Sequence, residues 1–195
     1  GPGGATPRSV ALVSANVTQT PVNRVSTIST SSGTVGYLLV TTFGPFSAEE
    51  QLADAAETLS AAGISDLVLD LRYNGGGLRV VASLRSYIIA GDARTAGRTF
   101  EQLEFNGTSG NQNPVTGTSN DPIPFYNTGL GFTLANGAPL DTLDLSRVFI
   151  LSTARTCSAS ESIINALRGI DVDIILIGDV TCGKPYGFYP TDNCG

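Results

Sequence analysis

Hydrophobic and polar positions along the chain follow strand-like and helix-like spacings in turn. Short runs of aliphatic and β-branched residues predict strands, at residues 8–14, 21–30, 36–41, 66–71, 147–152 and 173–177. Apolar positions with a helical period predict helices, at residues 47–63, 78–90 and 158–169. Because strands and helices alternate, we expect an α/β fold with a largely parallel central sheet and flanking helices.

Local signals refine two of these elements and describe the long segment between two of them. Ser47 and Glu50 form a capping-box pattern at the start of the first helix, and Gly63 follows its end. The run at 66–71 is continuously apolar, as in a strand buried inside a parallel sheet. Residues 91–146 are rich in Gly, Asn, Thr and Pro, so we expect short strands and long loops that cover a site.

Composition then limits the classes of protein. With 195 residues, 41% of them hydrophobic, the chain is long enough for one domain with a substantial core. A net charge of −6 without a basic run argues against nucleic acid or an anionic membrane as a partner. No apolar run approaches the roughly 20 residues that a membrane-spanning helix needs.

The census of basic residues narrows the candidate chemistry. The chain has no His, which removes Ser-His-Asp and Cys-His catalysis and makes a conventional zinc site unexpected. Its single lysine is Lys184, and every other cation is Arg. Arg stays protonated, whereas burial can neutralise a Lys amine, so Lys184 is the one amine suited to act as a base.

The two ends and the cysteines suggest an exported piece of a larger protein. The chain lacks Met and stops at Cys194-Gly195 after a turn-rich stretch, so we expect it to continue in a longer chain. Cys182 and Cys194 flank a turn and are expected to form a disulfide in an exported protein. A Cys157–Cys182 bridge and three unpaired cysteines are the alternatives.

Two loops after predicted strands carry groups suited to acyl transfer. Residues 74–77 read Asn-Gly-Gly-Gly, whose uncovered N–H groups suit an oxyanion, although a tight strand-to-helix turn is the simpler explanation of the glycines taken alone. Ser158 begins a predicted helix, where N–H groups and the helix dipole stabilise an attacking alkoxide. Ser158 and Glu161 also match a helix capping box, so a purely structural serine is the competing interpretation.

A third loop holds Lys184. It follows the strand after the Ser158 helix, and 26 residues separate Ser158 from Lys184, a distance that one strand-helix-strand unit spans. If the two strands are neighbours, a neutral Lys184 amine takes the Ser158 hydroxyl proton. This role requires a largely buried amine. The alternative is a surface lysine in a Gly-Pro turn.

Together the three loops resemble a known family. Residues 69–77 (LDLRYNGGG), 158–161 (SASE) and 181–184 (TCGK) are similar to motifs of the tail-specific, or C-terminal processing, serine peptidases, and the likeness extends over roughly 36–190. The resemblance implies Ser158 as nucleophile and Lys184 as base. It also implies an oxyanion hole from the N–H groups of Ala159 and Gly76, with Gly75 as the alternative to Gly76.

The resemblance carries expectations about the fold and the compartment. It implies a crotonase-like core over residues 21–195, with residues 1–20 as the tail of a preceding PDZ-like domain. Many members place a Gln four residues after the lysine, where this chain has Phe188. The group that orients Lys184 then lies beyond Gly195, is a different residue, or is absent. Residues 186–190 look like the exported, lipoprotein-like branch, periplasmic or anchored through a preceding lipoprotein segment.

These observations favour a serine endopeptidase that acts on polypeptides, near C-terminal tails or in exported proteins, without a metal or organic cofactor. A non-catalytic ligand- or peptide-binding module on the same fold is the main alternative. An acyl-CoA enzyme of the crotonase type is a third, and it would not need the Ser-Lys pair. The sequence gives no indication of the substrate's identity or of the oligomeric state.

Overall fold

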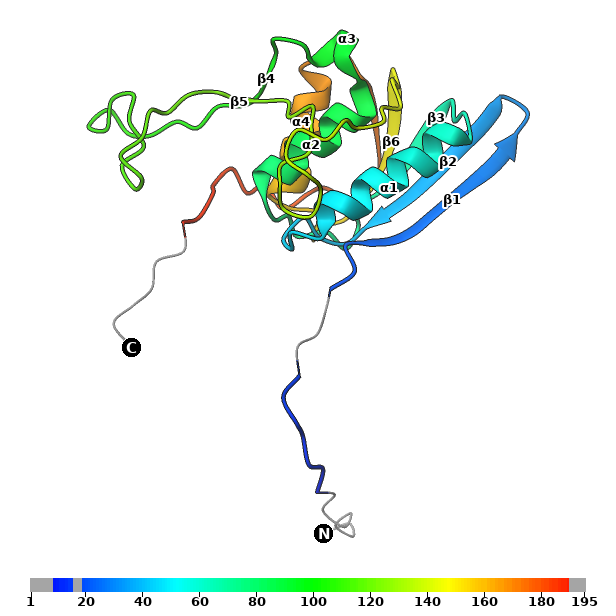
Figure 1. The fold of residues 1–195 in the computed structure, drawn as a ribbon, viewed down its shortest axis with the longest axis horizontal. Coiled ribbons are helices and arrows are strands. Elements are labelled where there is room, and N and C mark those ends of the chain that lie inside the picture. The colour runs from blue at the N-terminus through cyan, green and yellow to red at the C-terminus, as the bar shows by residue number, and fades with distance from the viewer. Residues whose placement is uncertain (1–8, 16–18, 190–195) are drawn as a thin grey trace.

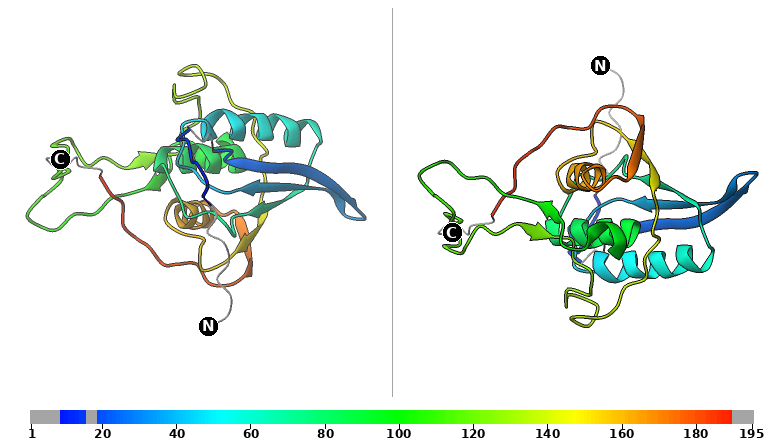
Figure 2. Two further views of the ribbon diagram at one scale, coloured as in Figure 1. Left: turned by 90° about the horizontal axis from the view of Figure 1, so that it is seen from below. Right: turned by 90° about the horizontal axis from the view of Figure 1, so that it is seen from above.

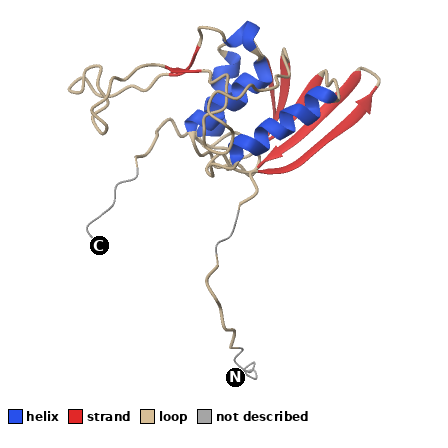
Figure 3. Cartoon of the chain, viewed as in Figure 1, coloured by secondary structure: helices blue, strands red, loops and turns tan. Residues whose placement is uncertain are grey.

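The computed structural model describes residues 9–15 and 19–189. Its centre is a five-stranded sheet with the strand order β1-β2-β3-β6-β7 (Figures 1 and 3). The β1–β2 pair is antiparallel, and the β2–β3, β3–β6 and β6–β7 pairs are parallel. The α/β architecture with a largely parallel sheet is therefore confirmed. The strands are β1 (Val22–Thr30), β2 (Gly33–Val40), β3 (Asp66–Asp70), β6 (Arg147–Ser152) and β7 (Asp173–Gly178).

The helices lie close to their predicted ranges. They are α1 (Ala48–Ala61), α2 (Arg79–Ala90), the short α3 (Asp92–Thr95) and α4 (Ala159–Arg168). Helix α1 packs against α2, and α2 packs against α4, so the three long helices form a row. Because successive parallel strands are added in one direction, right-handed crossovers place this row on one face of the sheet. No helix in the described part of the chain is long and apolar enough to span a bilayer.

The other face of the sheet is only partly covered. Along β2 and β6, fully buried residues such as Leu38 and Ile150 alternate with partly exposed ones such as Leu39 and Phe149. Val68 in β3 is likewise only half-buried. The predicted buried strand at 66–71 is nevertheless confirmed, because β3 is the central strand and Val68 is its only residue that is not buried.

The predicted strand at 8–14 is absent from the described residues 9–14, which form no regular structure. Val10, Leu12 and Val13 are 58%, 89% and 90% exposed. A strand needs a partner for its backbone groups, and this segment pairs with none of the described strands.

The segment at 91–146 holds short strands and long loops, as expected. Strands β4 (Thr99–Glu101) and β5 (Ile123–Pro124) pair antiparallel at the base of an arm that projects from the body of the molecule (Figures 1 and 2). Within the arm, the Asn113 side-chain amide donates a hydrogen bond to the Tyr189 hydroxyl. The arm therefore contacts the chain segment that follows Lys184.

Helix α1 begins with a different contact from the predicted capping box. Ser47 is the N-cap residue, but its side chain makes no capping hydrogen bond, and Glu50 is exposed. The fully buried Glu49 carboxylate instead accepts backbone N–H groups from a loop more than 80 residues away, those of Leu130, Phe132, Thr133 and Leu134. Burial alone would raise the pKa of Glu49, but these hydrogen bonds outweigh it and lower the pKa.

We expect Glu49→Gln to destabilise the protein by about 3 kcal/mol, because a Gln amide cannot accept the donors that now face both carboxylate oxygens. Chemical denaturation of the variant measures the change. The matched control is Glu50→Gln, on the exposed neighbouring residue, for which we expect a change below about 0.5 kcal/mol. Equal effects of the two substitutions would contradict the anchoring role of Glu49.

Candidate active site

Three loops meet at the carboxyl edge of the parallel strands. Residues 71–77 follow β3, residues 153–158 follow β6, and residues 179–184 follow β7. Backbone hydrogen bonds join them: Cys157 N–H donates to the Asn74 carbonyl at 3.1 Å, and Cys182 N–H donates to the Thr156 carbonyl at 3.0 Å. The structure thus brings together the three motifs that the sequence singles out.

The first loop is organised by Asn74, whose side chain is fully buried. Its Nδ2 donates to the Val40 carbonyl at 3.2 Å, and its Oδ1 accepts the Gly76 N–H at 2.9 Å. Its own carbonyl accepts the Cys157 N–H and, at 3.2 Å, the Ser160 hydroxyl. Asn74 therefore fixes the glycine loop against the start of α4.

Gly76 makes the close approach of these loops possible. Its φ of +107° is disfavoured for residues with a side chain. A Cβ at this position would also lie 2.8 Å from Ser158 Cβ and 2.9 Å from the Cys157 carbonyl oxygen. A glycine is thus required here for the loop to lie directly against Ser158.

Ser158 adopts a backbone conformation that non-glycine residues rarely take, with φ 58° and ψ −119°. Such conformations cost on the order of 1–3 kcal/mol and persist where the surroundings enforce them. Here the Ser158 N–H donates to Glu161 Oε2 at 2.8 Å, and α4 begins at the next residue. The resulting sharp strand-to-helix turn places Ser158 on a cleft rather than in the core.

Glu161 holds two of the loops together. Its Oε2 accepts the backbone N–H groups of Ser158 at 2.8 Å and Lys184 at 3.0 Å. Its Oε1 accepts the Thr181 hydroxyl and the Gly183 N–H, each at 2.7 Å. Burial alone would raise the pKa of Glu161, but these four donors outweigh it and lower the pKa. One carboxylate thus positions the backbone of both predicted catalytic residues.

The disulfide differs from the prediction. Cys182 pairs with Cys157, with a Cα–Cα distance of 5.2 Å, so the expected bridge to Cys194 is corrected. The hydrogen bond from Cys182 N–H to the Thr156 carbonyl brings the loop after β7 beside the residue that precedes Ser158. Cys194 itself lies outside the described residues. A crosslink enclosing this length of chain stabilises a fold by about 3 kcal/mol.

The two bridged cysteines and Glu161 are of residue types that bind metal ions, and they lie close together. Cys157, Glu161 and Cys182 present ligand atoms that lie within 4.8 Å of one another. Because the two sulfurs are bonded to each other, neither is a thiolate, which is the form that binds metals.

Lys184 is only half-buried, so the expectation of a largely buried amine is not met. Residues 185–189, which follow it, are exposed. Its Nζ lies over the Phe188 ring, 4.4 Å from the ring centre. Phe188 therefore touches the amine from the position where the resemblance leads one to expect Gln. Among the described residues, no hydrogen bond joins Nζ to Ser158 Oγ.

Ser158 and Lys184 nevertheless line one cleft of about 820 Å³. Its wall includes Gly75, Ala159 and Glu161 around the two residues. The base of the projecting arm forms a second wall, and the exposed segment after Lys184 forms a third (residues 102–105 and 185–189). The predicted nucleophile, the predicted base and the glycine loop therefore face a common space large enough for a peptide segment.

The candidate oxyanion donors are placed unequally. The Ala159 N–H opens α4, next to Ser158, and Ala159 lines the cleft. The Gly76 N–H donates to Asn74 Oδ1, whereas Gly75 lies on the cleft wall. The arrangement therefore favours Gly75, the alternative from the sequence, over Gly76 as the second donor.

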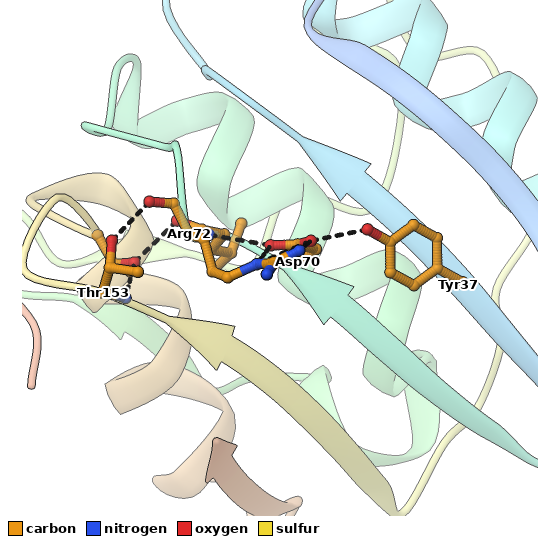
Figure 4. A network of polar contacts seen from close by, with 6 residues as sticks. Tyr37, Asp70, Arg72 and Thr153 are labelled. Carbon is orange, nitrogen blue, oxygen red and sulfur yellow. Dashed lines mark hydrogen bonds and ion pairs between the residues drawn. The ribbon is translucent and has the colours of Figure 1, made fainter. Parts of the chain in front are cut away.

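An ion pair between the half-exposed Arg72 and the buried Asp70 lies at the start of the loop after β3 (Figure 4). The Arg72 guanidinium grips the fully buried Asp70, with Nη2 2.7 Å from Oδ2, and the Tyr37 hydroxyl donates to the same oxygen at 2.7 Å. Burial alone would raise the pKa of Asp70, but the bonds from Arg72 and Tyr37 lower it. The Thr153 hydroxyl donates to the Arg72 carbonyl at 2.6 Å, which ties the loop after β6 to the loop after β3.

Sequence reasoning missed the wider role of Glu161. Its spacing from Ser158 signalled only a capping box, whereas three of its four donors come from the loop after β7. No local pattern signals a contact with a loop 20 or more residues away. The Asp70–Arg72 pair lies inside the recognised motif, but the sequence alone does not show that the Arg72 carbonyl accepts a hydrogen bond from Thr153.

Comparison with known proteins identifies the family. The model of peptidase family S41 matches residues 34–187, most of the chain. The chain therefore belongs to peptidase family S41, a family of serine peptidases, and the resemblance read from the three motifs is confirmed. Among curated proteins, none matches the chain.

Solved structures agree with this assignment. A putative S41 protease from Bacteroides fragilis is 28% identical, with a TM-score of 0.71 over 91% of this chain and 44% of its own. The photosystem II D1 C-terminal processing protease is 23% identical, with a TM-score of 0.58 over 86% of this chain and 38% of its own. A lipoprotein from Streptococcus agalactiae, 16% identical, has a TM-score of 0.51 over 76% and 47%. The chain thus spans less than half the length of these proteins.

We expect Glu161→Gln to lower peptidase turnover about a hundredfold. Each Glu161 carboxylate oxygen accepts two hydrogen bonds, and we call these four bonds the Glu161 clasp. In either orientation, the Gln amide turns its NH₂ group toward two of the donors, so two of the four bonds are lost. Steady-state kinetics on wild type and variant measure the loss. The control, Glu57→Gln on the exposed side of α1, should keep wild-type turnover.

Protonation of Glu161 should weaken the same hydrogen bonds as its substitution, and the loss should appear in the pH dependence of stability. Because its folded-state pKa is lowered, the stabilisation is complete above its ordinary value near 4.3 and is lost as the pH falls through the folded pKa. We therefore expect stability to fall in the acid range below about pH 4 in wild type, with a smaller acid loss in Glu161→Gln. Equal acid profiles would contradict the clasp.

Proposed function

We propose that the protein is a serine endopeptidase in which Ser158 is the nucleophile and Lys184 the general base. The observation that carries this proposal is the shared cleft: Ser158, in a strained strand-to-helix turn, and Lys184 line the same wall, and Glu161 holds the backbone of both. In a crotonase-like core, the fold that the resemblance implies, the carboxyl edge of the sheet is where such a site is expected.

The proposed reaction uses residues of the cleft. Neutral Lys184 Nζ takes the Ser158 hydroxyl proton while Oγ attacks the peptide carbonyl. The N–H groups of Ala159 and Gly75 stabilise the oxyanion of the tetrahedral intermediate. Lys184 then gives the proton to the leaving amine, and a water molecule hydrolyses the acyl-enzyme, with Lys184 again as base.

In the described structure, Lys184 Nζ is not hydrogen-bonded to Ser158 Oγ, so the mechanism requires the two atoms to approach each other. Catalytic hydrogen bonds often tighten only when substrate is bound. A peptide in the cleft would cover the exposed side of Lys184 and displace water from it. Phe188, in contact with Nζ, takes the place of a hydrogen-bonding Gln and holds the amine at the edge of the cleft.

The polypeptide substrate and the compartment are part of the same proposal. One similar structure is a C-terminal processing protease, which suggests substrates with exposed C-terminal tails. The Cys157–Cys182 disulfide suggests an oxidising, exported location, because such bridges persist outside the cytosol. No step of the proposed mechanism uses a metal or an organic cofactor.

A non-catalytic peptide-binding module is the second candidate. The contact of Lys184 Nζ with Phe188, without a hydrogen bond to Ser158 Oγ in the described structure, favours it. Such a module would use the same cleft to hold a peptide without cleaving it.

Incubation of the full-length oxidised protein with short unstructured peptides, each with a free or an amidated C-terminus, separates the two functions. Mass spectrometry identifies the fragments, and fluorescence anisotropy measures binding. We expect cleavage by wild type, faster for free C-termini, and none by Ser158→Ala. Tight binding without cleavage, unchanged in Ser158→Ala, would instead establish the binding module.

A further inference from the structure

Apart from the backbone, the Cys157–Cys182 disulfide is the one covalent link between the Ser158 loop and the Lys184 loop in the described part of the chain. Cys157 immediately precedes Ser158, and Cys182 lies two residues before Lys184. We propose that this bridge is a site of thiol–disulfide exchange, at which a dithiol reductant releases the Lys184 loop from the Ser158 loop. The consequence for turnover rests on the proposed peptidase function.

The bridge is open to attack from solvent. Cys182 is exposed and Cys157 is half-buried, so an incoming thiolate reaches the Cys182 sulfur first. The new bond joins the reductant to Cys182 Sγ, and the sulfur of Cys157 leaves as a thiolate that takes up a proton. The second thiol of the reductant then displaces Cys182. Two electrons and two protons pass to the protein, and the reductant becomes a cyclic or bridged disulfide.

After exchange, the Lys184 loop depends mainly on Glu161. Residues 181–184 keep the bonds from Thr181, Gly183 and Lys184 to the carboxylate and one backbone bond from Cys182 to Thr156. At the start of the loop, Asp179 stays bonded to Ser152. Residues 185–189, which follow directly, are exposed. Hydrogen bonds at a solvent-facing edge open readily, whereas a covalent bridge does not.

Exchange takes place beside the residue that holds the Lys184 loop. The sulfurs of Cys157 and Cys182 lie within 4.8 Å of a Glu161 carboxylate oxygen. A change of position of either sulfur after reduction therefore occurs next to the carboxylate that positions Lys184.

The test is a redox titration of the full-length protein in mixtures of reduced and oxidised dithiothreitol. A chelator is present throughout, because the reduced thiols and Glu161 together offer ligands for a metal ion. Alkylation and mass spectrometry give the reduced fraction of Cys157 and Cys182. Amide hydrogen exchange over residues 179–187 reports on the loop, and peptide cleavage reports on turnover.

We expect exchange over 179–187 to rise at least tenfold, and kcat to fall at least tenfold, with the same midpoint as reduction of the bridge. Both should recover on reoxidation. The Cys157→Ala/Cys182→Ala double variant should show the reduced behaviour in every mixture. Cys194→Ala should titrate as wild type, which assigns the response to the described bridge.

Two results would overturn the proposal: a bridge that is reduced only when the whole protein unfolds, or a reduced bridge that leaves hydrogen exchange over 179–187 unchanged. If neither redox state cleaves peptide, the peptidase proposal fails instead. The hydrogen-exchange data still decide the proposal about the bridge. Faster hydrogen exchange over 179–187 on reduction supports it, and unchanged hydrogen exchange refutes it.

Discussion

Ser158→Ala is expected to reduce peptide cleavage by at least a thousandfold while leaving the fold intact. Alanine removes only Oγ, the atom that attacks the substrate, and loss of a nucleophile costs several orders of magnitude in turnover. The Ser158 N–H that donates to Glu161 belongs to the backbone and remains in the variant. Steady-state kinetics with the most rapidly cleaved peptide measure the loss.

Thermal unfolding of the same variant separates catalysis from helix capping. A capping serine contributes about 0.5–2 kcal/mol of stability, so its loss lowers the melting temperature by a few degrees without affecting turnover of the folded protein. Ser60→Ala, on the exposed side of α1, is the control and should keep wild-type turnover and melting temperature. Activity retained in Ser158→Ala would assign Ser158 to capping alone.

Lys184→Arg is expected to abolish cleavage to a similar extent. Arginine has a similar length and can still reach the Phe188 ring, but it stays protonated at any useful pH and so cannot accept the Ser158 proton. The backbone N–H of residue 184 still bonds to Glu161, so the loop should keep its position. Peptide cleavage measures the effect, and hydrogen exchange over 179–187 checks that the loop is unchanged.

Two companions make the Lys184 result specific. Lys184→Met keeps the length of the side chain without a basic group and should be as inactive as Lys184→Arg. Arg168→Lys, on an exposed residue at the end of α4, should have wild-type activity. Substantial turnover in Lys184→Arg would exclude proton transfer through this residue and leave only a role for its charge.

Elements whose signal is local could be predicted from the sequence. The run at 147–152 is bounded by polar residues and turns on both sides, and β6 has those bounds. The helix at 158–169 was predicted from its serine start and apolar period, and α4 differs from it by one residue at each end. Because these strands and helices alternate, their order also predicted that the three loops share one edge of the sheet.

Features that depend on contacts between distant residues could not be predicted. The Cys157–Cys182 bridge required knowing that Cys182 N–H bonds to the loop after β6, whereas the turn between Cys182 and Cys194 offered a nearer partner. The burial of Glu49 depends on a loop 81 or more residues away in sequence. Residues 9–14 show the converse, since a strand-like pattern forms no strand without a partner.

The position of Lys184 shows where spacing and geometry differ. The 26-residue spacing correctly placed Lys184 on the same cleft as Ser158. It did not predict that Nζ would contact Phe188, because side-chain direction depends on the exposed segment after Lys184. Backbone topology brings two residues to one site, and the neighbouring side chains then decide which atoms meet.

The most direct test of the Ser-Lys mechanism is labelling with a fluorophosphonate, which reacts only with an activated serine. The full-length oxidised protein is treated with the probe, and the modified residue is identified by peptide mass spectrometry. We predict labelling at Ser158 in wild type and in Arg168→Lys, and none in Ser158→Ala or Lys184→Met. A folded wild-type protein that resists the probe, or that is labelled at Ser158 equally with and without Lys184, would contradict the mechanism.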